Sequence, residues 1–396
     1  MASDLLAAAP ERRSRAHRAT LGAFVALGVA AGSWGSRIPD IRDHLDLAEG
    51  SLGTALLGLS VGAVAGAWLG GLLVRRFGSR RVVTGAWLLV GALLVLPGAA
   101  GTWAQLALGL LALGLGIGVL DVSMNGAGIQ LEAAAARPLL NGLHAGWSGG
   151  VLVGAALGSL AVAAGLAVGA HLALAGAVIV VSGTLLGPAA PDGRIATGSH
   201  QDDAAAGGVP PRRRHRWRLP ALAAIGGFLF LSEGAMLDWF GVLVREDLDG
   251  GEILGAVAVT GFSAGGLAGR LLGDRLTLRW GAGRLVRLGV VVSGAGLAFA
   301  LASPSAVPVP VLLVVVGAGM APAIPLAFAA AGRIHGEHGI AVVTTAGYGC
   351  YLAGPALIGW LADAVGLHTA LLVPLALILA VVALAWSTSD LAPFPT

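Results

Sequence analysis

The sequence predicts an all-α membrane protein with twelve transmembrane helices in two pseudo-symmetric six-helix bundles. Hydrophobic residues make up 56% of the 396 residues and charged residues only 11%, and the mean hydropathy is +0.85. A soluble domain carries roughly 25% charged residues, so these charges cannot cover a water-soluble surface. They lie in clusters between long apolar runs, and the alternating pattern of a transmembrane β-barrel does not occur.

Twelve apolar windows account for the predicted helices. Crossing about 30 Å of hydrocarbon takes roughly 20 helical residues. Windows near that length, bounded by Arg, Asp, Glu, Gly or Pro, cover residues 20–38, 51–73, 82–99, 103–127, 140–164, 166–187, 219–243, 252–273, 284–302, 306–331, 339–364 and 366–387. Because no cleavage site follows the first window, we expect a retained helix rather than a secretory signal.

Arginine placement predicts the orientation, because positively charged loops stay in the cytoplasm. On one side lie 21 of the 24 basic residues, which are all Arg: positions 12, 13, 15, 18, 75, 76, 80, 81, 137, 194, 212, 213, 214, 216, 218, 270, 275, 279, 284, 287 and 333. On the other side lie Arg37, Arg42 and Arg245, near acids such as Asp40 and Glu246. This predicts a multi-pass protein of the bacterial inner membrane with both termini cytoplasmic.

A polar stretch at residues 188–218 divides the chain. It predicts a cytoplasmic tail at 1–19, a six-helix bundle at 20–187, a linker at 188–218, a second bundle at 219–387 and a tail at 388–396. The linker ends in RRRHRWR, which we expect to lie against anionic lipid headgroups. The basic excess is thereby explained by membrane orientation, and no nucleic-acid partner is predicted.

Several chemistries are excluded or disfavoured by composition. The chain has no Lys, so it has neither a P-loop lysine nor a Schiff-base lysine. Its single Cys, Cys350, excludes an internal disulfide and a CxxC site. We therefore expect no cofactor and no metal site.

The two halves of the chain look duplicated. RDHLDLAEGSLG at 42–53 is echoed by REDLDGGEILG at 245–255, so that Arg42, Leu45, Asp46 and Gly53 recur at offsets of 202 or 203. GLLVRRFGSRR at 71–81 is likewise echoed by GRLLGDRLTLRWGAGR at 269–284. Such a repeat predicts a substrate site near the membrane midplane between the halves.

Glycine recurs every fourth residue in three predicted spans. The stripes are Gly58, Gly62, Gly66 and Gly70; Gly142, Gly146, Gly150, Gly154 and Gly158; and Gly261, Gly265, Gly269 and Gly273. This spacing keeps glycine on one helix face, where two backbones can approach closely. The stripes indicate either a moving interface or generic tight packing.

With these features the chain resembles the major facilitator superfamily over essentially its whole length. The superfamily's loop signature, approximately G-x-L-x-D-R-x-G-R-R, is matched by Gly71, Arg76, Gly78, Arg80 and Arg81, and in the second half by Gly269, Asp274 and Arg275. Arg75 stands where the first-half signature usually has Asp. The resemblance therefore implies a cytoplasmic gating latch that rests on Asp274 instead.

Within the superfamily the chain is most similar to bacterial fucose-permease-like sugar transporters, through DVSMN at 121–125, HAGWSGG at 144–150 and SEGAMLDWF at 232–240. The resemblance implies a monomer that works by alternating access on a small polar solute, such as a sugar, together with protons. Those transporters use acids on spans one and four. Asp121 fills the second role, but span one has no acid between Thr20 and Ile38.

Acids inside the apolar spans are candidates for proton coupling, since an ionised side chain at the bilayer centre costs about 2.5–3.5 kcal/mol. A carboxylate in a cavity that opens and closes to water can load and release a proton. Glu233 is the first candidate as carrier and Asp121 the second; the alternative is a carboxylate that only fastens helices together. Asp238 lies nearer the outer interface, where a structural role competes with substrate contact.

Further side chains are predicted to contact the solute. His144 and Trp147 lie one turn apart, which suits hydroxyl bonding and ring stacking. The other candidates are Trp34, Arg37, Asn125, Asp238, Trp239, Tyr348 and Tyr351. Each has packing or interface anchoring as its alternative, and Arg37 could instead bind an anionic solute.

The sequence thus predicts a proton-coupled symporter and no enzyme. GWSGG at 146–150 matches the G-x-S-x-G pattern, but a nucleophile elbow needs a strand before it and an apolar helix is predicted here. Three alternatives remain: proton-coupled efflux of a drug or metabolite, an intramembrane serine protease using Ser148 with His144, and a non-transporting membrane sensor.

Overall fold

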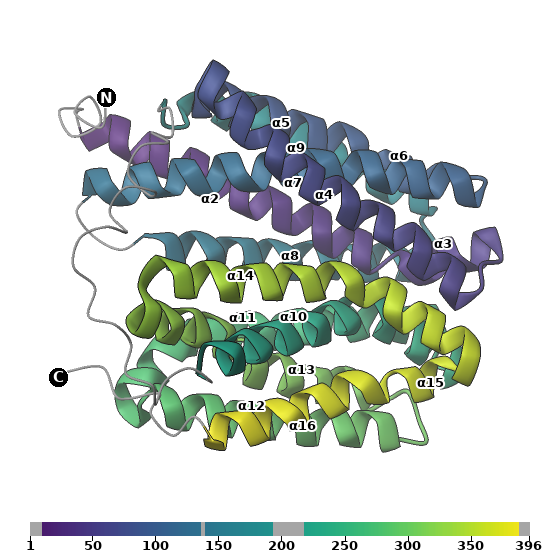
Figure 1. The fold of residues 1–396 in the computed structure, drawn as a ribbon. Helices are drawn as coiled ribbons and strands as arrows, with labels where there is room; N and C mark the ends of the chain where they lie inside the picture. Colours follow the sequence, from purple (N-terminus) through teal and green to yellow (C-terminus); the bar gives the residue numbers. More distant parts are fainter. Residues whose placement is uncertain (1–9, 136–138, 193–217, 388–396) are drawn as a thin grey trace. The chain divides into compact units, whose positions relative to one another are not determined.

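The computed structural model describes residues 10–135, 139–192 and 218–387, and every regular element among them is helical (Figure 1). The first half contains α2 (Pro10–Gly35), α3 (Ile38–Leu45), α4 (Glu49–Phe77), α5 (Ser79–Leu93), α6 (Val95–Gly98), α7 (Trp103–Ala135), α8 (Leu140–Ala163), α9 (Val168–Leu186) and the short η1 (Gly187–Ala189). The second half contains α10 (Arg218–Val242), η4 (Leu243–Asp247), α11 (Gly251–Trp280), α12 (Ala282–Ala302), α13 (Val309–Met320), α14 (Ala323–Val365), α15 (Leu367–Ala370) and α16 (Leu372–Ser387).

Among the described residues, ten helices are long and apolar enough to cross a membrane, or eleven if α2 and α3, bent by 42° at their junction, form one span. The all-α transmembrane prediction is confirmed. The predicted separation of spans ten and eleven is wrong, since α14 stays helical through residues 332–338. No proline occurs between Pro325 and Pro355 to end the helix. The helix break falls earlier, at Ala321 and Pro322.

Two compact units make up the fold. Unit 1 comprises residues 1–33, 58–154 and 167–212, and unit 2 comprises residues 34–57, 155–166 and 213–396. Their boundaries fall inside α2, α4 and α8, so that one end of each of these helices belongs to unit 2. The bundle boundaries 20–187 and 219–387 stay a prediction of the sequence.

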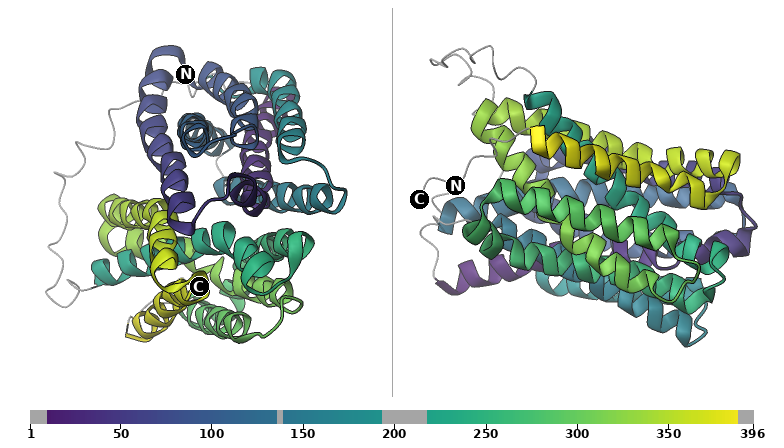
Figure 2. Two further views of the ribbon diagram at one scale, coloured as in Figure 1. Left: turned by 90° about the vertical axis from the view of Figure 1, so that its right-hand side faces the viewer. Right: turned by 90° about the horizontal axis from the view of Figure 1, so that it is seen from below.

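Each unit has its own core. In unit 1, α5 packs against α7 and α9, and Trp87 of α5 is fully buried. In unit 2, α10 packs along α14 and α11 along α13, and both views in Figure 2 show the helices of residues 218–387 running side by side. The carboxylates of α10 are thereby held within a helical core.

Glycine stripes bring helix backbones into direct contact. A Cβ atom built on Gly58 of α4 would lie 2.8 Å from the carbonyl oxygen of Ala107 on α7, and Cβ atoms on Gly62 and Gly66 would meet the carbonyls of Leu111 and Leu115. The same contact recurs in unit 2, where Gly261, Gly265 and Gly269 of α11 face Pro310, Val314 and Ala318 of α13. Each glycine of α4 and its contact residue on α7 lie 203 positions before the equivalent glycine of α11 and its contact residue on α13. The stripes therefore serve close packing, as their spacing predicts.

The internal repeat is visible in the backbone angles as well. Asp46 (φ 49°) and Asp249 (φ 51°), 203 positions apart, are the only non-glycine residues with positive φ in the described segments. Gly78 and Gly281, also 203 apart, both have φ 81° and begin the helix that follows. Because left-handed backbone is rare outside glycine, its recurrence at Asp46 and Asp249 supports the duplication.

The glycine contacts predict a pair of matched stability effects. Gly62→Ala and Gly265→Ala should each lower the stability of the protein by about 1–3 kcal/mol, because the added methyl meets a carbonyl that cannot move independently of its helix. Thermal unfolding in detergent measures this. Gly85→Ala is the control, since its Cβ would meet nothing within 4 Å. Equal melting temperatures for Gly62→Ala and Gly85→Ala would rule out the α4–α7 contact.

Candidate functional site

An ion pair lies between α10 and α11 of unit 2. Arg270 Nη2 donates to Glu233 Oε1 at 2.8 Å, and the two side chains are 23% and 12% exposed. Glu233 is 15 residues from Arg218 and 14 from Asp247, the ends of the candidate span that α10 forms with η4, which places it roughly 21 Å from either end of that span at 1.5 Å per residue. Each charge compensates the other at a depth where a lone charge is costly.

Arg270 was missed as a site residue by the sequence analysis, which placed it with the cytoplasmic arginines. Its guanidinium extends back along α11, as helical side chains do, and a Cβ on Gly266 would lie only 3.4 Å from Arg270 Nη1. Glycine four residues earlier therefore leaves room for the arginine to reach α10. An arginine four residues after a glycine within an apolar helix is the sequence pattern that could have identified Arg270 as a site residue.

Three aromatic rings lie close to this pair, and we call them the aromatic group: Phe230 of α10, with Phe328 and Tyr351 of α14. The Phe230 ring is edge-on to Phe328 at 6.1 Å and to Tyr351 at 6.2 Å. Phe230 precedes Glu233 by three residues and shares its helix face. The Tyr351 ring lies 3.4 Å from where a Cβ on Gly234 would stand. The structure thus packs the predicted Tyr351 against α10 next to Gly234, the neighbour of Glu233 in the chain, together with two phenylalanines that the sequence did not single out.

Asp121 lies in unit 1 on α7 and is partly buried. Asn125 Nδ2 donates to Asp121 Oδ1 at 3.1 Å and to the Asp121 carbonyl at 2.9 Å. Asp121 and Asn125, one turn apart, therefore lie on the same face of α7. No cationic side chain pairs with Asp121 among the described residues, which distinguishes it from Glu233.

His144, Trp147 and Ser148 lie in unit 1 on α8. The His144 ring is exposed and packs edge-on against Phe24 at 5.0 Å. Ser148 Oγ donates to the carbonyl oxygen of His144 at 3.1 Å. The single hydroxyl proton is thus directed to the main chain, and no nucleophile elbow forms on this continuous helix.

Four further candidates, Trp34, Arg37, Asp238 and Trp239, lie in unit 2, near the C-terminal ends of α2 and α10. Trp34 and Trp239 are buried, and neither indole Nε1 has a hydrogen-bond partner in the described part of the chain. Arg37 Nε lies 2.8 Å from Asp40 Oδ2, and its Nη2 donates to the Leu166 carbonyl at 2.7 Å. Asp238 is partly buried, with no polar partner among the described side chains. The side chain of Tyr348 lies outside the described residues.

The predicted gating loop follows α4. Gly78 allows the tight turn, and Arg80 Nε donates to the Ala190 carbonyl at 2.9 Å while its Nη1 lies 3.7 Å from Asp192 Oδ2. Asp192, after the sixth span, is thus the carboxylate nearest this loop, which the signature did not indicate. Arg76 stacks over Phe77, Gly71 lies within α4, and the side chains of Arg81 and Arg275 make no hydrogen bond or ion pair with another described side chain. Gly269 packs on Ala318, and the side chain of Asp274 lies outside the described residues.

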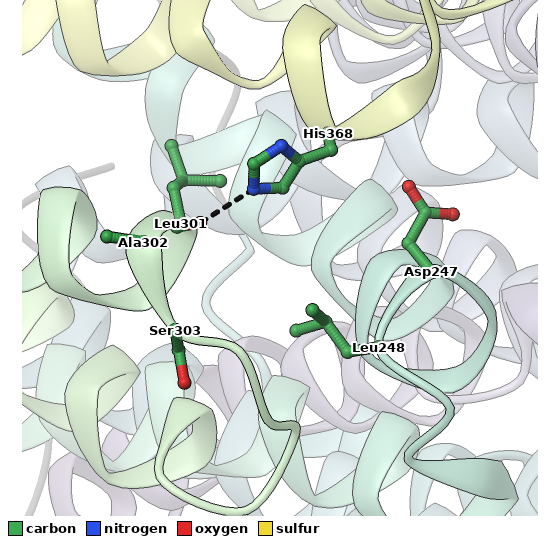
Figure 3. A pocket seen from close by; sticks show the side chains of 6 residues that line it. All are labelled: Asp247, Leu248, Leu301, Ala302, Ser303 and His368. Atoms are coloured by element: carbon green, nitrogen blue, oxygen red, sulfur yellow. Dashed lines mark hydrogen bonds between the residues drawn. The ribbon is translucent and has the colours of Figure 1, made fainter.

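A separate hollow of about 580 Å³ lies at one end of unit 2, between η4 and the adjoining ends of α12 and α15 (Figure 3). It is lined by Asp247, Leu248, Leu301, Ala302, Ser303 and His368. Figure 3 shows the His368 ring directed toward Leu301, whose carbonyl lies 2.6 Å from His368 Nε2. Since Asp247 is a helix half-length from Glu233, this hollow is distinct from the ion-pair region.

Residues 19–346 match the Major Facilitator Superfamily. The chain belongs to this superfamily. It is 30% identical over 375 residues to an uncharacterized transporter, y4wD, of Sinorhizobium fredii, covering 91% of this chain and 97% of that protein. The chain is therefore a multi-pass membrane transporter.

Solved structures agree with the fold. The nucleoside transporter NupG, as a D323A mutant, superposes with a TM-score of 0.70 at 15% identity, covering 96% of this chain and 100% of NupG. FucP, a superfamily transporter in the outward conformation, gives a TM-score of 0.62 at 16% identity, covering 94% of this chain and 98% of FucP. At these identities the likeness shows the major facilitator fold alone, and the fucose-permease-like branch stays a prediction.

The ion pair predicts a non-additive stability effect. Glu233→Gln or Arg270→Gln alone leaves one charge uncompensated, which costs about 3–5 kcal/mol for a fully buried pair and less here because both side chains keep some exposure. The double variant, with two neutral amides, should melt above at least one of the single variants. Thermal unfolding in detergent tests this, and purely additive losses would argue against the pairing.

Proposed function

We propose that this transporter moves a small polar solute, such as a sugar or nucleoside, in symport with protons by alternating access. In this proposal it acts as a monomer in the bacterial inner membrane, with both termini in the cytoplasm. Glu233 carries the proton and Arg270 is its counter-ion. The observation that supports this most is the partly exposed ion pair between Glu233, in the middle of the candidate span Arg218–Asp247, and Arg270 on the membrane-spanning helix α11.

Competition for Arg270 couples the two fluxes in this scheme. While Glu233 is ionised it occupies the guanidinium, and a solute must displace it. Protonation neutralises Glu233 and leaves Arg270 with a positive charge and unused donors in a region of low dielectric constant. A solute hydroxyl or carbonyl then binds these donors. Proton and solute therefore favour each other's binding, which is the thermodynamic requirement for symport.

The aromatic group supplies the complementary surface for the solute. Phe230, Phe328 and Tyr351 offer apolar ring faces and edges beside the charged pair. Sugars and nucleosides combine an apolar ring face with hydroxyl groups, so rings and a guanidinium can recognise both parts of such a solute. NupG, which shares the fold, is a nucleoside transporter, and the sequence motifs resemble those of sugar transporters.

Release follows from the reverse competition. When the site opens to the cytoplasm, where the proton concentration is lower in an energised cell, Glu233 loses its proton and pairs with Arg270 again. Because the carboxylate is tethered next to the guanidinium at 2.8 Å, it competes with the solute at high effective concentration. The solute is displaced and the transporter returns empty with its charges paired.

Asp121 is the second candidate carrier in the same scheme. It has an amide partner in Asn125 rather than a cation, so its protonation frees no positive group. Asp121 therefore suits hydrogen bonding to the solute, and Glu233 suits coupling.

The Glu233→Gln variant tests the coupling. The substitution should abolish accumulation driven by an inward proton gradient, because the amide cannot ionise, while exchange of internal for external solute continues. Uptake of labelled uridine, L-fucose and D-galactose into proteoliposomes, with and without an imposed pH gradient, measures both activities for whichever solute the parent protein accumulates. The sign of the gradient that drives uptake separates symport from efflux by antiport.

Two variants complete the design. Glu11→Gln alters an exposed carboxylate near the start of α2 and should accumulate solute like the parent. Asp121→Asn should weaken uptake but keep its response to the pH gradient. Glu233 would not be the proton carrier if the Glu233→Gln variant still accumulated solute under a proton gradient. The same conclusion would follow if only the Asp121→Asn variant lost gradient-driven accumulation.

A further inference from the structure

A dense ion-pair network lies in unit 2 at the end of the helices that the arginine pattern places outside. Arg42 Nη2 lies 2.6 Å from Glu49 Oε1, and Arg42 Nη1 pairs with Glu246. Arg245 Nη2 lies 2.6 Å from Asp43 Oδ2 and 3.2 Å from Glu252 Oε1. We call these six residues the clasp: Arg42, Asp43, Glu49, Arg245, Glu246 and Glu252.

The clasp has the symmetry of the internal repeat. Its members form three equivalent pairs offset by 203 positions: Arg42 with Arg245, Asp43 with Glu246, and Glu49 with Glu252. Each arginine binds the acid seven residues later in its own repeat and also the acid that follows the arginine of the other repeat. The two arginine side chains are even buried alike, at 13% and 12% exposure.

Local backbone geometry explains why both repeats present this arrangement. Asp46 and Asp249 both adopt the left-handed conformation, and their amides donate to the carbonyls of Asp43 and Glu246, respectively. The chain therefore reverses at the same point in each repeat. This reversal returns Glu49 to Arg42 and Glu252 to Arg245.

Hydrogen bonds join further first-repeat and second-repeat residues of unit 2. Asp363 Oδ1 accepts from the Gly50 amide at 2.8 Å, and Trp360 Nε1 donates to Thr54 at 3.0 Å, so that the start of α4 is held against α14. Ser159 of α8 and Thr260 of α11 share a hydrogen bond of 2.9 Å. The clasp is therefore the charged part of a wider contact between first-repeat and second-repeat residues.

We infer that the clasp is the lock of the outer entrance, and that it opens by exchanging cross-repeat for within-repeat ion pairs. The cross-repeat pairs, Arg42–Glu246 and Arg245–Asp43, and with them the Arg245–Asp40 pair, must break when residues 40–49 part from residues 245–252. The within-repeat pairs, Arg42–Glu49 and Arg245–Glu252, can persist. Because each guanidinium keeps one carboxylate throughout, opening leaves neither arginine without a counter-ion.

The inference separates two pairs of acids that are otherwise alike. Removing Asp43 and Glu246 abolishes only cross-repeat pairs and should favour the open entrance. Removing Glu49 and Glu252 abolishes only within-repeat pairs and should leave the entrance as closed as before, or more so. The role of the clasp as a lock rests on the alternating access of the proposed function. It does not depend on which carboxylate carries the proton.

Accessibility of a buried cysteine on the segment that precedes the clasp tests this. Ser36 is 2% exposed and precedes Arg37 on the same segment, and Cys350 is the only cysteine, so a Ser36→Cys, Cys350→Ser protein carries one buried reporter. A membrane-impermeant maleimide is added outside intact cells, and its rate of reaction with the cysteine is measured. Adding Asp43→Asn with Glu246→Gln should raise this rate roughly three- to tenfold, because two partly exposed ion pairs that hold the entrance closed are lost. The matched control, Glu49→Gln with Glu252→Gln, removes the same charge and should give no increase.

A charge-preserving exchange guards against a folding defect. Asp43→Glu with Glu246→Asp keeps both cross-repeat pairs and should label at the parent rate. If the double neutral variant does not reach the membrane, Asp43→Asn alone supplies the measurement. An unchanged labelling rate in the neutral variants, or an equal rise in the matched control, would overturn the inference. Since labelling requires no transport, this result is independent of the outcome for Glu233→Gln.

Discussion

Compensation of charge in a medium without water is the constraint on which the functional parts of this molecule depend. Hydrocarbon solvates neither a carboxylate nor a guanidinium, so a charged group persists there only with a partner. Glu233 of α10 and Arg270 of α11 compensate each other, and Arg37 pairs with Asp40 and donates to a main-chain carbonyl. In such an ion pair, each charge is stabilised by the other. A proton or a solute that binds one of the two groups therefore changes the free energy of the other group. Coupling between ligands arises directly from that dependence.

The uncharged framework obeys a related constraint. Apolar helices in lipid gain little from burying apolar side chains against each other, and their association relies on close van der Waals contact. The glycine stripes provide this by bringing α4 to α7 and α11 to α13 backbone to backbone. The contact occurs in both repeats at equivalent positions, which gives each half an interface of the same geometry. Polar pairs can then be placed between helices whose spacing is fixed by glycine rather than by the polar groups themselves.

Much of the fold was accessible from the sequence because its signals are long or periodic. Window length fixed the helices, the offset near 203 revealed the duplication, and the Gly/Arg loop indicated the superfamily. The contacts of the site were less accessible. Helices α7 and α10 are apolar on nearly every face, so their sequences do not encode which face meets which neighbour. Arg270, inside the predicted span 252–273, is therefore counted only with the cytoplasmic arginines, and Phe230 and Phe328 are not among the predicted site residues. The helix α14 continued through a polar segment that had been interpreted as a loop, since polarity alone does not end a helix. Glu233, Asp121 and Tyr351 are predicted because a polar group within the membrane is costly and therefore indicates a function or a polar contact. The same argument does not identify which residue each of them contacts.

The clasp is not perfectly symmetric, and its imperfection gives an order of events. Arg245 has a third carboxylate, Asp40, from the first repeat, whereas the position 203 residues beyond Asp40 is Leu243. Arg245 therefore holds two acids across the repeat boundary and Arg42 holds one. The inferred opening is therefore expected to begin at Arg42, which has one cross-repeat carboxylate to release, and to end at Arg245, which has two. The last cross-repeat contact to be lost is then expected to include Asp40.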